Sequence, residues 1–386
     1  MKHIGILELH YHIKYLYTTA KIFKTKKTDV TIFVTKEIYD KLSEYLKNMD
    51  EYKFVIKKTE ESIDKYLKRI EKKCSNDIDI LFVNTIQKSM IDLPHYKKFN
   101  PDCKKILTIH VANSWFSSKP GFDLRKFHLT LDSHLSTYYA KKHVLLKYDG
   151  INVIYPPIKQ WIRNNTDYQK PIYTIPFGFC EENKFEKTKN LDKNVFVVPG
   201  QIQEHRRDYN IVFDIFERLF DKHNNKIKLI LLGYPVGSYG ERIQNRFKNL
   251  RDKGFDIEFF KDFVPEKIYN DKMKNVDFIF LPIQIKSRGL GVTPEWYGKS
   301  KGSAAFFEGV NYRKPMILPD EFNVLKEFNS SIIKYKHIDD LEIKINNLLK
   351  ETGNISSIKN EAIKNSEYFS LKNLQNYFIK NILEDN

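Results

Sequence analysis

Short apolar, β-branched runs alternate with longer amphipathic stretches along the first part of the chain. The predicted strands here are residues 4–9, 30–35, 52–57, 78–83, 105–110, 129–131 and 153–155. Residues 11–24, 37–47 and 62–73, which lie between these strands, carry apolar side chains at helical spacing. Strand and helix in this order predict right-handed βαβ units and a mostly parallel sheet.

This rhythm stops after residue 155 and restarts near residue 195. Pro156, Pro157, Pro171 and Pro176 fall in or next to the polar stretch 159–193, which predicts a connection rather than core. Beyond it, the predicted strands are residues 195–198, 228–233, 257–260, 276–281 and 315–318. The predicted helices are residues 209–222, 241–253, 267–275 and 303–311.

The chain therefore reads as two similar α/β units. We expect domains at residues 1–165 and 190–355, and a helical segment at 356–386 that crosses back to the first domain. Open α/β sheets bind ligands beyond the carboxyl ends of their strands. The expected fold class is two facing Rossmann-like domains, with the active site in the cleft between them.

The composition fits a folded, soluble chain and excludes several classes. Of the 386 residues 41% are hydrophobic, and no apolar run is long enough for a membrane helix. Cys74, Cys103 and Cys180 are odd in number and far apart, so we expect neither a disulfide framework nor a cysteine zinc site. A net charge of +16 permits nucleic acid, an anionic membrane or a phosphate-bearing substrate, but the lysines are scattered, as in any Lys-rich proteome.

A small-residue segment precedes the predicted helix at 303–311. Its Gly-Lys-Ser at 298–300 is not a Walker A loop, because the position that needs a glycine is Thr293. Gly302 and Ser303 instead open the helix, where backbone N–H groups and the helix dipole favour an anion. The alternative is a solvated loop in which Ser303 is an ordinary helix cap.

Two charged positions stand out in the second half. Glu308 lies among apolar neighbours, where a carboxylate needs a partner or a ligand such as a diol. Arg206 and Arg207 precede a predicted helix, and arginine binds phosphate in a planar, bidentate manner. The alternatives are a surface glutamate and an exposed basic turn.

In this combination the chain resembles GT-B glycosyltransferases of the retaining "glycosyl transferases group 1" type, as a divergent branch. The resemblance covers most of the chain and is clearest over residues 195–318. Glu-Gly-Val-Asn-Tyr-Arg-Lys-Pro-Met-Ile at 308–317 is similar to the family's Glu-Ala-x-Ala-x-Gly-Lys-Pro-Val-Ile. Residues 200–207, 231–233 and 260–264 resemble its basic glycine loop, glycine-ended strand and Phe-x-Gly-x-Val segment.

The resemblance implies roles for single residues. Glu308 is expected at the donor ribose, and His110, at the end of a strand, near the reacting sugar, where a neutral imidazole accepts or relays a hydroxyl hydrogen. The expected catalytic residues are His110, Arg206 and Lys301. The expected donor-binding residues are Gly200, Gln201, Arg206, Arg207, Gly233, Lys299, Lys301, Gly302, Ser303 and Glu308. The expected sugar or acceptor contacts are His10, His12, Glu295 and Tyr297.

The sequence also departs from the family pattern. Ser300 stands where the family often has a glutamate that touches the transferred sugar, and Glu295 is the candidate substitute. Gln201 follows Gly200 in place of an arginine. Neither a cofactor nor a metal is expected, because helix dipole and basic side chains stabilise the leaving diphosphate in such enzymes.

The expected activity is metal-independent, anomer-retaining transfer of a sugar from a nucleotide diphosphate-sugar, with a UDP-sugar favoured. The expected acceptor is a hydroxyl group of a glycan or a lipid-linked molecule. Three alternatives stay open: a DNA-modifying or nucleic-acid-binding protein, a sugar-nucleotide epimerase, and an inactive partner subunit. Nucleic acid is the less favoured partner, because no recognisable binding module is present.

We expect a cytoplasmic location, because the cysteine usage suits a reducing compartment. Residues 14–27, with Tyr15, Tyr17 and Phe23, suggest peripheral contact with an anionic membrane surface on the inner face. The alternative for this basic, aromatic segment is an ordinary amphipathic helix packed on the sheet.

Overall fold

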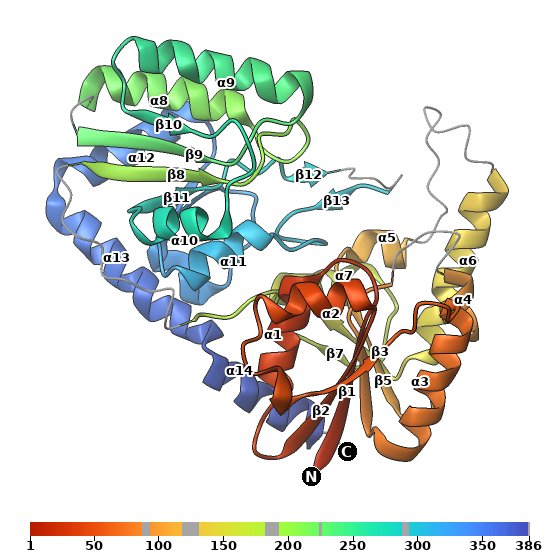
Figure 1. The fold of residues 1–386 in the computed structure, drawn as a ribbon. Helices are drawn as coiled ribbons and strands as arrows, with labels where there is room; N and C mark the ends of the chain where they lie inside the picture. The colour runs from red at the N-terminus through yellow and green to blue at the C-terminus, as the bar shows by residue number, and fades with distance from the viewer. Residues whose placement is uncertain (87–92, 118–130, 182–192, 224–225, 288–292, 385–386) are drawn as a thin grey trace.

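Two parallel sheets form the two domains of the computed structural model, which describes residues 1–86, 93–117, 131–181, 193–223, 226–287 and 293–384 (Figure 1). The N-terminal sheet has seven strands in the order β3-β2-β1-β4-β5-β6-β7. The C-terminal sheet has six in the order β10-β9-β8-β11-β14-β15. The predicted fold class, two α/β domains, is confirmed.

The N-terminal domain alternates strand and helix for most of its length. Its strands are β1 (Lys2–Glu8), β2 (Thr28–Val34), β3 (Lys53–Ile56), β4 (Ile80–Val83), β5 (Lys104–Ile109), β6 (Gly150–Val153) and β7 (Ile172–Tyr173). Its helices are α1 (Ile13–Phe23), α2 (Lys36–Ser43), α3 (Ile63–Asp77), α4 (Leu93–Lys98), α5 (Ala112–Phe116), α6 (Leu131–Lys147) and α7 (Pro156–Asn165). In β1, Ile4 and Ile6 pair with both neighbouring strands and are fully buried, as expected for a central parallel strand.

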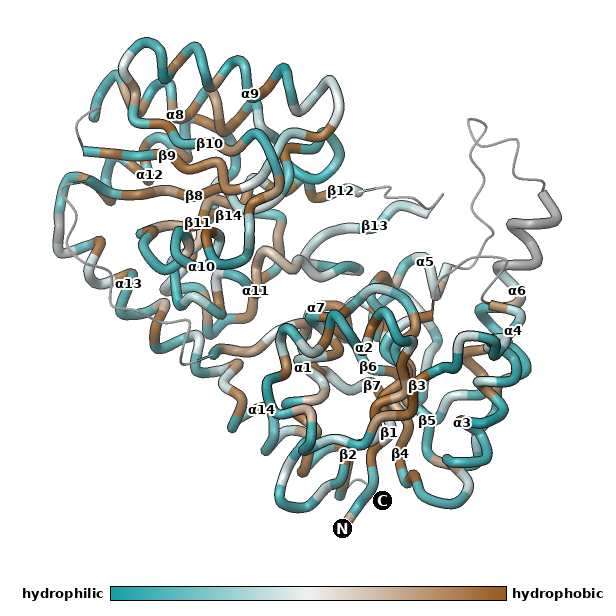
Figure 2. Tube along the Cα trace, in the orientation of Figure 1, coloured by the Kyte–Doolittle hydropathy of each residue, from teal (hydrophilic) through white to brown (hydrophobic). Residues whose placement is uncertain are grey.

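The C-terminal domain repeats this pattern. Its strands are β8 (Asn194–Pro199), β9 (Ile227–Leu232), β10 (Ile257–Phe259), β11 (Phe278–Phe280), β14 (Met316–Pro319) and β15 (Ile332–Tyr335). Its helices are α8 (Tyr209–His223), α9 (Gly237–Asp252), α10 (Glu266–Lys274), α11 (Ala304–Asn311) and α12 (Ile338–Lys350). The antiparallel pair β12 (Lys286–Ser287) and β13 (Glu295–Trp296) extends from this domain toward α5 (Figure 1). Figure 2 shows hydrophobic residues concentrated in the strands and hydrophilic ones along much of α3 and α9.

The end of the chain returns to the N-terminal domain. After α13 (Thr352–Ser366), helix α14 (Leu371–Phe378) lies beside α1 (Figure 1). The ring of Phe378 lies 4.5 Å from that of Phe23, and the Gln375 amide donates to the carbonyls of Lys21 and Lys24. Within the described residues, η1 (Met49–Glu51), η5 (Lys326–Ser331) and η6 (Glu367–Phe369) are 3₁₀ helices, and η7 (Ile379–Leu383) is a π-helix.

Helix α1 packs its aromatic residues inward. Tyr15 and Phe23 are fully buried, while Tyr17 is half-buried. This is the arrangement of an ordinary amphipathic helix on a sheet, the alternative to membrane contact. Within the described ranges, no helix has the length and apolar character that crossing a membrane requires.

Aromatic side chains from the two domains pack against one another where α11 meets the N-terminal domain. Tyr155, between β6 and α7, lies with its ring 5.1 Å from that of Phe306 and 6.0 Å from that of Phe322. Its hydroxyl donates to the Asn323 carbonyl at 2.9 Å. All three rings are buried, so the contact between α11 and the N-terminal domain is part of the core.

The structure differs from the sequence predictions between residues 129 and 193. Pro156 and Pro157 begin α7 instead of a connection, since a proline suits the first turn of a helix. Strand β7 extends the N-terminal sheet within the same stretch. Leu131 begins α6 rather than ending a strand, and residues 129–130 lie outside the described residues. The sequence analysis also missed β15 and α12.

Candidate active site

Three histidines from the sequence prediction gather at the carboxyl end of the N-terminal sheet. His10 and His12 follow β1, and His110 follows β5. The rings of His12 and His110 are stacked with their centroids 4.2 Å apart. His110 Nε2 lies 2.9 Å from the Asn84 carbonyl oxygen, which can only accept a hydrogen bond. His110 therefore carries a hydrogen on Nε2 and donates this hydrogen bond.

A buried carboxyl lies behind this cluster, at the end of β1. Glu8 is fully buried, and it accepts from the Thr85 hydroxyl at 2.6 Å and from the His10 N–H at 2.8 Å. Burial raises the pKa of Glu8 to about 7. Glu8 is not among the residues predicted from the sequence, although a glutamate inside an apolar strand is a visible signal.

Thr85 connects this carboxyl to His12. The Thr85 hydroxyl oxygen lies 2.8 Å from His12 Nδ1. When Glu8 is ionised, the single Thr85 hydrogen is donated to the carboxylate, so the Thr85 oxygen accepts from His12 Nδ1–H. Burial, together with His110 and His10, lowers the pKa of His12 to about 2, so its ring is neutral near pH 7.

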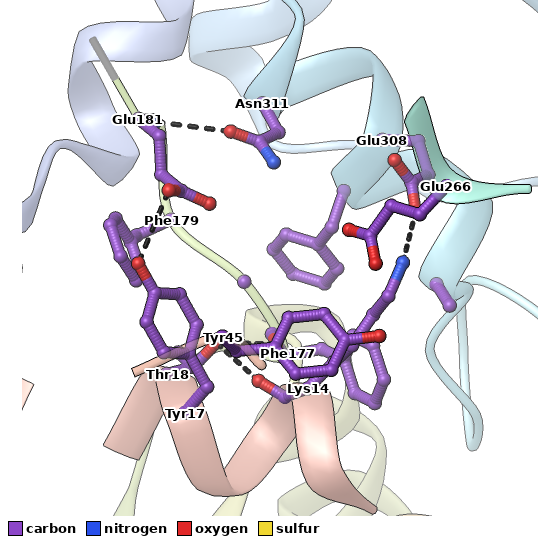
Figure 3. Close-up of a pocket in the computed structure, with 13 residues that line it drawn as sticks. Lys14, Tyr17, Thr18, Tyr45, Phe177, Phe179, Glu181, Glu266, Glu308 and Asn311 are labelled. Carbon is purple, nitrogen blue, oxygen red and sulfur yellow. Dashed lines mark hydrogen bonds and ion pairs between the residues drawn. The ribbon is translucent and has the colours of Figure 1, made fainter. Parts of the chain in front are cut away.

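Glu308 faces the N-terminal domain from α11. Its Oε1 lies 3.5 Å from Nζ of Lys14 on α1, and this carboxylate raises the pKa of Lys14 (Figure 3). Glu266 of α10 and Tyr45 line the same pocket, together with the segment at residues 177–181 that leaves the N-terminal sheet. The enclosed volume is about 70 Å³, enough for only a few water molecules. Sequence reasoning found Glu308 but missed Lys14 and Glu266.

The loops that follow β8 and β9 lie in direct contact. Gly200 has φ +92°, and a Cβ on Gly233 would lie 2.1 Å from the Gly200 carbonyl oxygen. Gly200 also lies under Arg207, because a Cβ on this glycine would lie 2.8 Å from a guanidinium nitrogen. Gln201 donates from its amide to the Tyr234 hydroxyl. Both predicted glycines therefore serve a close approach that side chains would block.

The two arginines of this loop differ in environment. Arg207 is half-buried and donates to the Gln201 carbonyl at 3.5 Å, whereas Arg206 is exposed. Burial and Glu308 raise the pKa of Tyr269 on α10, and Arg207 opposes them. Tyr269 therefore lies close enough to both Arg207 and Glu308 to be influenced by their charges. The loop that carries Gly200 and Arg207 is thus near the Glu308 pocket.

Glu295 lies beside Ser300, the position where the resemblance places a glutamate. The Ser300 hydroxyl donates to Glu295 Oε2 at 2.6 Å. The backbone N–H groups of Asn113 and Ser114, in the first turn of α5, donate to the same carboxylate at 3.2 and 2.8 Å. Glu295 is buried, so this carboxylate ties the β12–β13 pair to the N-terminal domain.

The segment that opens α11 also touches the N-terminal domain. Lys301 forms a backbone bridge with Val111, the residue after His110, so two predicted catalytic positions come close together. Lys301 Nζ lies 4.5 Å from the centroid of the Tyr297 ring. A Cβ on Gly302 would contact Ile154 and Tyr155 at 3.3 Å, and Ser303 is buried.

Lys299 is not among the residues that line the Glu308 pocket. It lines an open groove with Trp296, Trp161 and Asn113. Within the described part of the chain, no three His, Cys, Asp or Glu side chains are grouped so that they could hold a metal ion.

Solved structures of other proteins have the same architecture as this chain. No protein-family model and no curated protein matches the sequence. A glycosyltransferase from Rickettsia africae is 14% identical, with 100% of this chain and 99% of that chain covered and a TM-score of 0.65. HepE of Anabaena, solved in complex with UDP, is 12% identical, with 99% and 100% covered and a TM-score of 0.65. The lipopolysaccharide outer core galactosyltransferase WaaB is 13% identical, with 100% of both chains covered and a TM-score of 0.61.

These likenesses extend over both domains and the whole length of the chain. They show that the protein has the GT-B fold, in which two Rossmann-like domains face each other. The resemblance recognised in the sequence is thereby confirmed at the level of the fold.

Proposed function

We propose that the protein is a glycosyltransferase that moves a sugar from a nucleotide diphosphate-sugar to a hydroxyl group of a glycan or lipid-linked acceptor. The observation that carries this proposal is the position of Glu308, which faces the interdomain pocket from α11 of a GT-B fold. A carboxylate in this position accepts both hydrogens of a ribose diol. HepE, which has a similar structure, was solved with UDP, and this supports a UDP-sugar as the donor.

The donor diphosphate is assigned to the start of α11 and to Arg207. Ser303 precedes the first helical residue, so the backbone N–H groups and the dipole of α11 favour negative charge there. Arg207 provides a planar guanidinium close to Gly200. Arg206 and Lys301 add positive charge as the bond to the diphosphate breaks, and no metal is required in this scheme.

The reacting hydroxyl is assigned to the histidine cluster. The His110 ring, held by the hydrogen bond from its Nε2–H to the Asn84 carbonyl, is placed to orient a hydroxyl group of the sugar or of the acceptor. Lys301 lies next to this segment, because its backbone pairs with Val111, the residue after His110. The family resemblance favours retention of the anomeric configuration.

A nucleoside needs more room than the Glu308 pocket offers. The volume of the pocket is about 70 Å³, and Lys14 forms an ion pair with the Glu308 carboxylate. Donor binding therefore includes separation of the two domains at this point, followed by closure that excludes water.

The test is a thermal-shift panel with UDP, GDP, ADP, CMP and dTDP. We expect UDP to raise the unfolding midpoint of the native chain and of Glu241→Ala, a control on the exposed surface of α9, but not of Glu308→Ala. Equal stabilisation of all three proteins by UDP would mean that the nucleotide binds away from Glu308. No stabilisation by any nucleotide contradicts the proposal and favours an inactive or nucleic-acid-binding relative.

Product analysis completes the assignment. Incubation with a stabilising UDP-sugar and acceptor is expected to release UDP and form a glycoside, whose anomeric configuration NMR reports. A product with inverted anomeric configuration would contradict the retaining mechanism, but it would still support sugar transfer. UDP released without a glycoside favours the epimerase.

A further inference from the structure

A second opening in the molecule is an aromatic groove between the domains. It shares no lining residue with the Glu308 pocket, and its volume is about 500 Å³. Pockets for small molecules span roughly 300–1,000 Å³, so this groove has the size of a binding site. The groove is lined by Asn113, Phe116, Ser117, Trp161, Asn165, Trp296 and Lys299.

The lining chemistry suits a carbohydrate. Two of the three tryptophans of the chain, Trp161 and Trp296, are half-buried and line the groove together with Phe116. Flat rings cover the apolar C–H face of a sugar ring, and carboxamides such as Asn113 and Asn165 both donate to and accept from hydroxyl groups.

The same lining argues against nucleic acid as the occupant. Single-stranded nucleic acid binds where stacking rings lie along a row of cations that follows the backbone. Among the described lining residues, Lys299 is the single charged side chain. An uncharged oligosaccharide fits this combination of aromatic rings, carboxamides and a single lysine better than nucleic acid does.

The backbone that carries Trp296 is held by well-defined contacts. The backbone N–H of Trp296 donates to the Ser300 hydroxyl at 3.0 Å, and its carbonyl accepts from the backbone N–H groups of Lys299 and Lys301, both at 3.1 Å. Trp161 lies on α7, and the Asn113 amide donates to the Pro294 carbonyl at 2.7 Å. The backbone at these positions therefore has little freedom to lose when a ligand docks in the groove.

The groove adjoins the segment that carries His110. Asn113 lines the groove, and its N–H binds Glu295, the carboxylate beside Ser300. Two residues earlier, Val111 pairs with Lys301, and His110 precedes it. A glycan in the groove is therefore bound next to the segment that carries His110.

We propose that this groove binds an oligosaccharide segment of the acceptor, with Trp161 and Trp296 stacking on its sugar rings. The proposal rests on the proposed transferase function, whose acceptor it narrows to a glycan. Because Trp161 belongs to the N-terminal domain and Trp296 to the C-terminal domain, the glycan is bound by both domains together.

The tryptophans themselves supply the measurement. Maltohexaose, cellohexaose, chitohexaose and an oligothymidylate are titrated into the full-length Trp115→Phe protein, which lacks the buried tryptophan next to the groove. We expect at least one hexasaccharide to change the emission in a saturable manner. Trp161→Ala and Trp296→Ala, followed by calorimetry, are expected to weaken binding roughly tenfold each, and Trp296→Phe to restore part of it.

Tyr368→Ala, an exposed aromatic residue on η6, is the matched control and is expected to bind as the native chain does. Thermal unfolding checks that each variant is folded, and Asn165→Ala, an exposed position on α7, probes the groove without removing a ring. Loss of affinity in Tyr368→Ala to the same degree, or unchanged affinity in both tryptophan variants, overturns the proposal.

The remaining outcomes separate this inference from the donor assignment. No emission change with any hexasaccharide overturns the groove proposal, and UDP stabilisation abolished by Glu308→Ala would still support the donor site. Glycan binding without any nucleotide response would support the groove and contradict the transferase. Salt-sensitive binding of the oligothymidylate alone would identify a nucleic-acid site instead.

Discussion

Lys14 Nζ lies 3.5 Å from Glu308 Oε1, and this ion pair joins α1 of the N-terminal domain to α11 of the C-terminal domain (Figure 3). The carboxylate is the one to which the proposed function assigns the donor ribose. Lys14 and the ribose therefore compete for one partner. Because the Lys14 side chain is 52% exposed, the pair is worth only about 0–1 kcal/mol and can be broken by a ligand.

Replacing the lysine tests this competition. Lys14→Met is expected to bind UDP roughly two- to fivefold more tightly in calorimetry, because the nucleotide no longer displaces an ammonium group. Lys21→Met, on the same helix and outside the pocket, is the control and is expected to leave the affinity unchanged. Weaker binding by Lys14→Met would mean that Lys14 contacts the nucleotide instead of competing with it.

The two neighbouring arginines are expected to differ in their effect on donor binding. Arg207→Ala removes the half-buried guanidinium over Gly200, so we expect the UDP affinity to fall by about tenfold or more. Arg206→Ala removes an exposed charge and is expected to change the affinity by less than about threefold at physiological salt. The reverse order, measured by calorimetry, would assign the diphosphate to Arg206, which the resemblance places among the expected catalytic residues.

The contact between the β8 and β9 loops predicts a strong stability effect at one glycine. In Gly233→Ala the new Cβ would lie 2.1 Å from the Gly200 carbonyl oxygen, so the loops must move apart. We expect the variant to lose about 1–3 kcal/mol in denaturant unfolding and to lose UDP binding. Gly353→Ala in α13, where a Cβ meets nothing within 4 Å, is the control and is expected to be neutral or slightly stabilising.

The positions that the sequence located well are those with a local signal. Gly200, Gly233 and His110 follow clear apolar strands, and parallel strands bring their carboxyl ends to one edge of a sheet. Glu308 stands out because an acid interrupts an apolar helix. Each of these features is visible in a window of about ten residues or fewer.

Features that depend on contacts between distant segments were missed. Lys14 reads as one more lysine in a basic helix until the fold brings α11, nearly three hundred residues later, against α1. Glu295 was named only as a substitute, and its contact with α5 depends on the two-residue strand β13, too short for any periodicity. Pro156 and Pro157 were misread because a proline pair ends or begins a helix equally well in sequence.

Glu8 predicts an unusual dependence of stability on pH. Its pKa rises from 4.5 to about 7 on folding, so the folded chain holds this proton more tightly than the unfolded chain. The stabilisation is present below pH 4.5 and is lost as the pH rises to about 7, up to a total of about 3 kcal/mol. His12 acts in the opposite sense, because its lowered pKa removes stability as the pH falls below 6.5.

The comparison of Glu8→Gln with the native chain isolates the carboxyl, because glutamine stays neutral at every pH. Relative to the native chain, Glu8→Gln is expected to gain free energy of unfolding as the pH rises from 4.5 to 7, measured by urea titrations across this interval. Glu241→Gln, at an exposed position of α9, is the control and is expected to follow the native profile. A constant difference between Glu8→Gln and the native chain would mean that folding does not raise the pKa of Glu8. In that case the Thr85 hydroxyl donates to a carboxylate, and His12 keeps its hydrogen on Nδ1, over most of the interval.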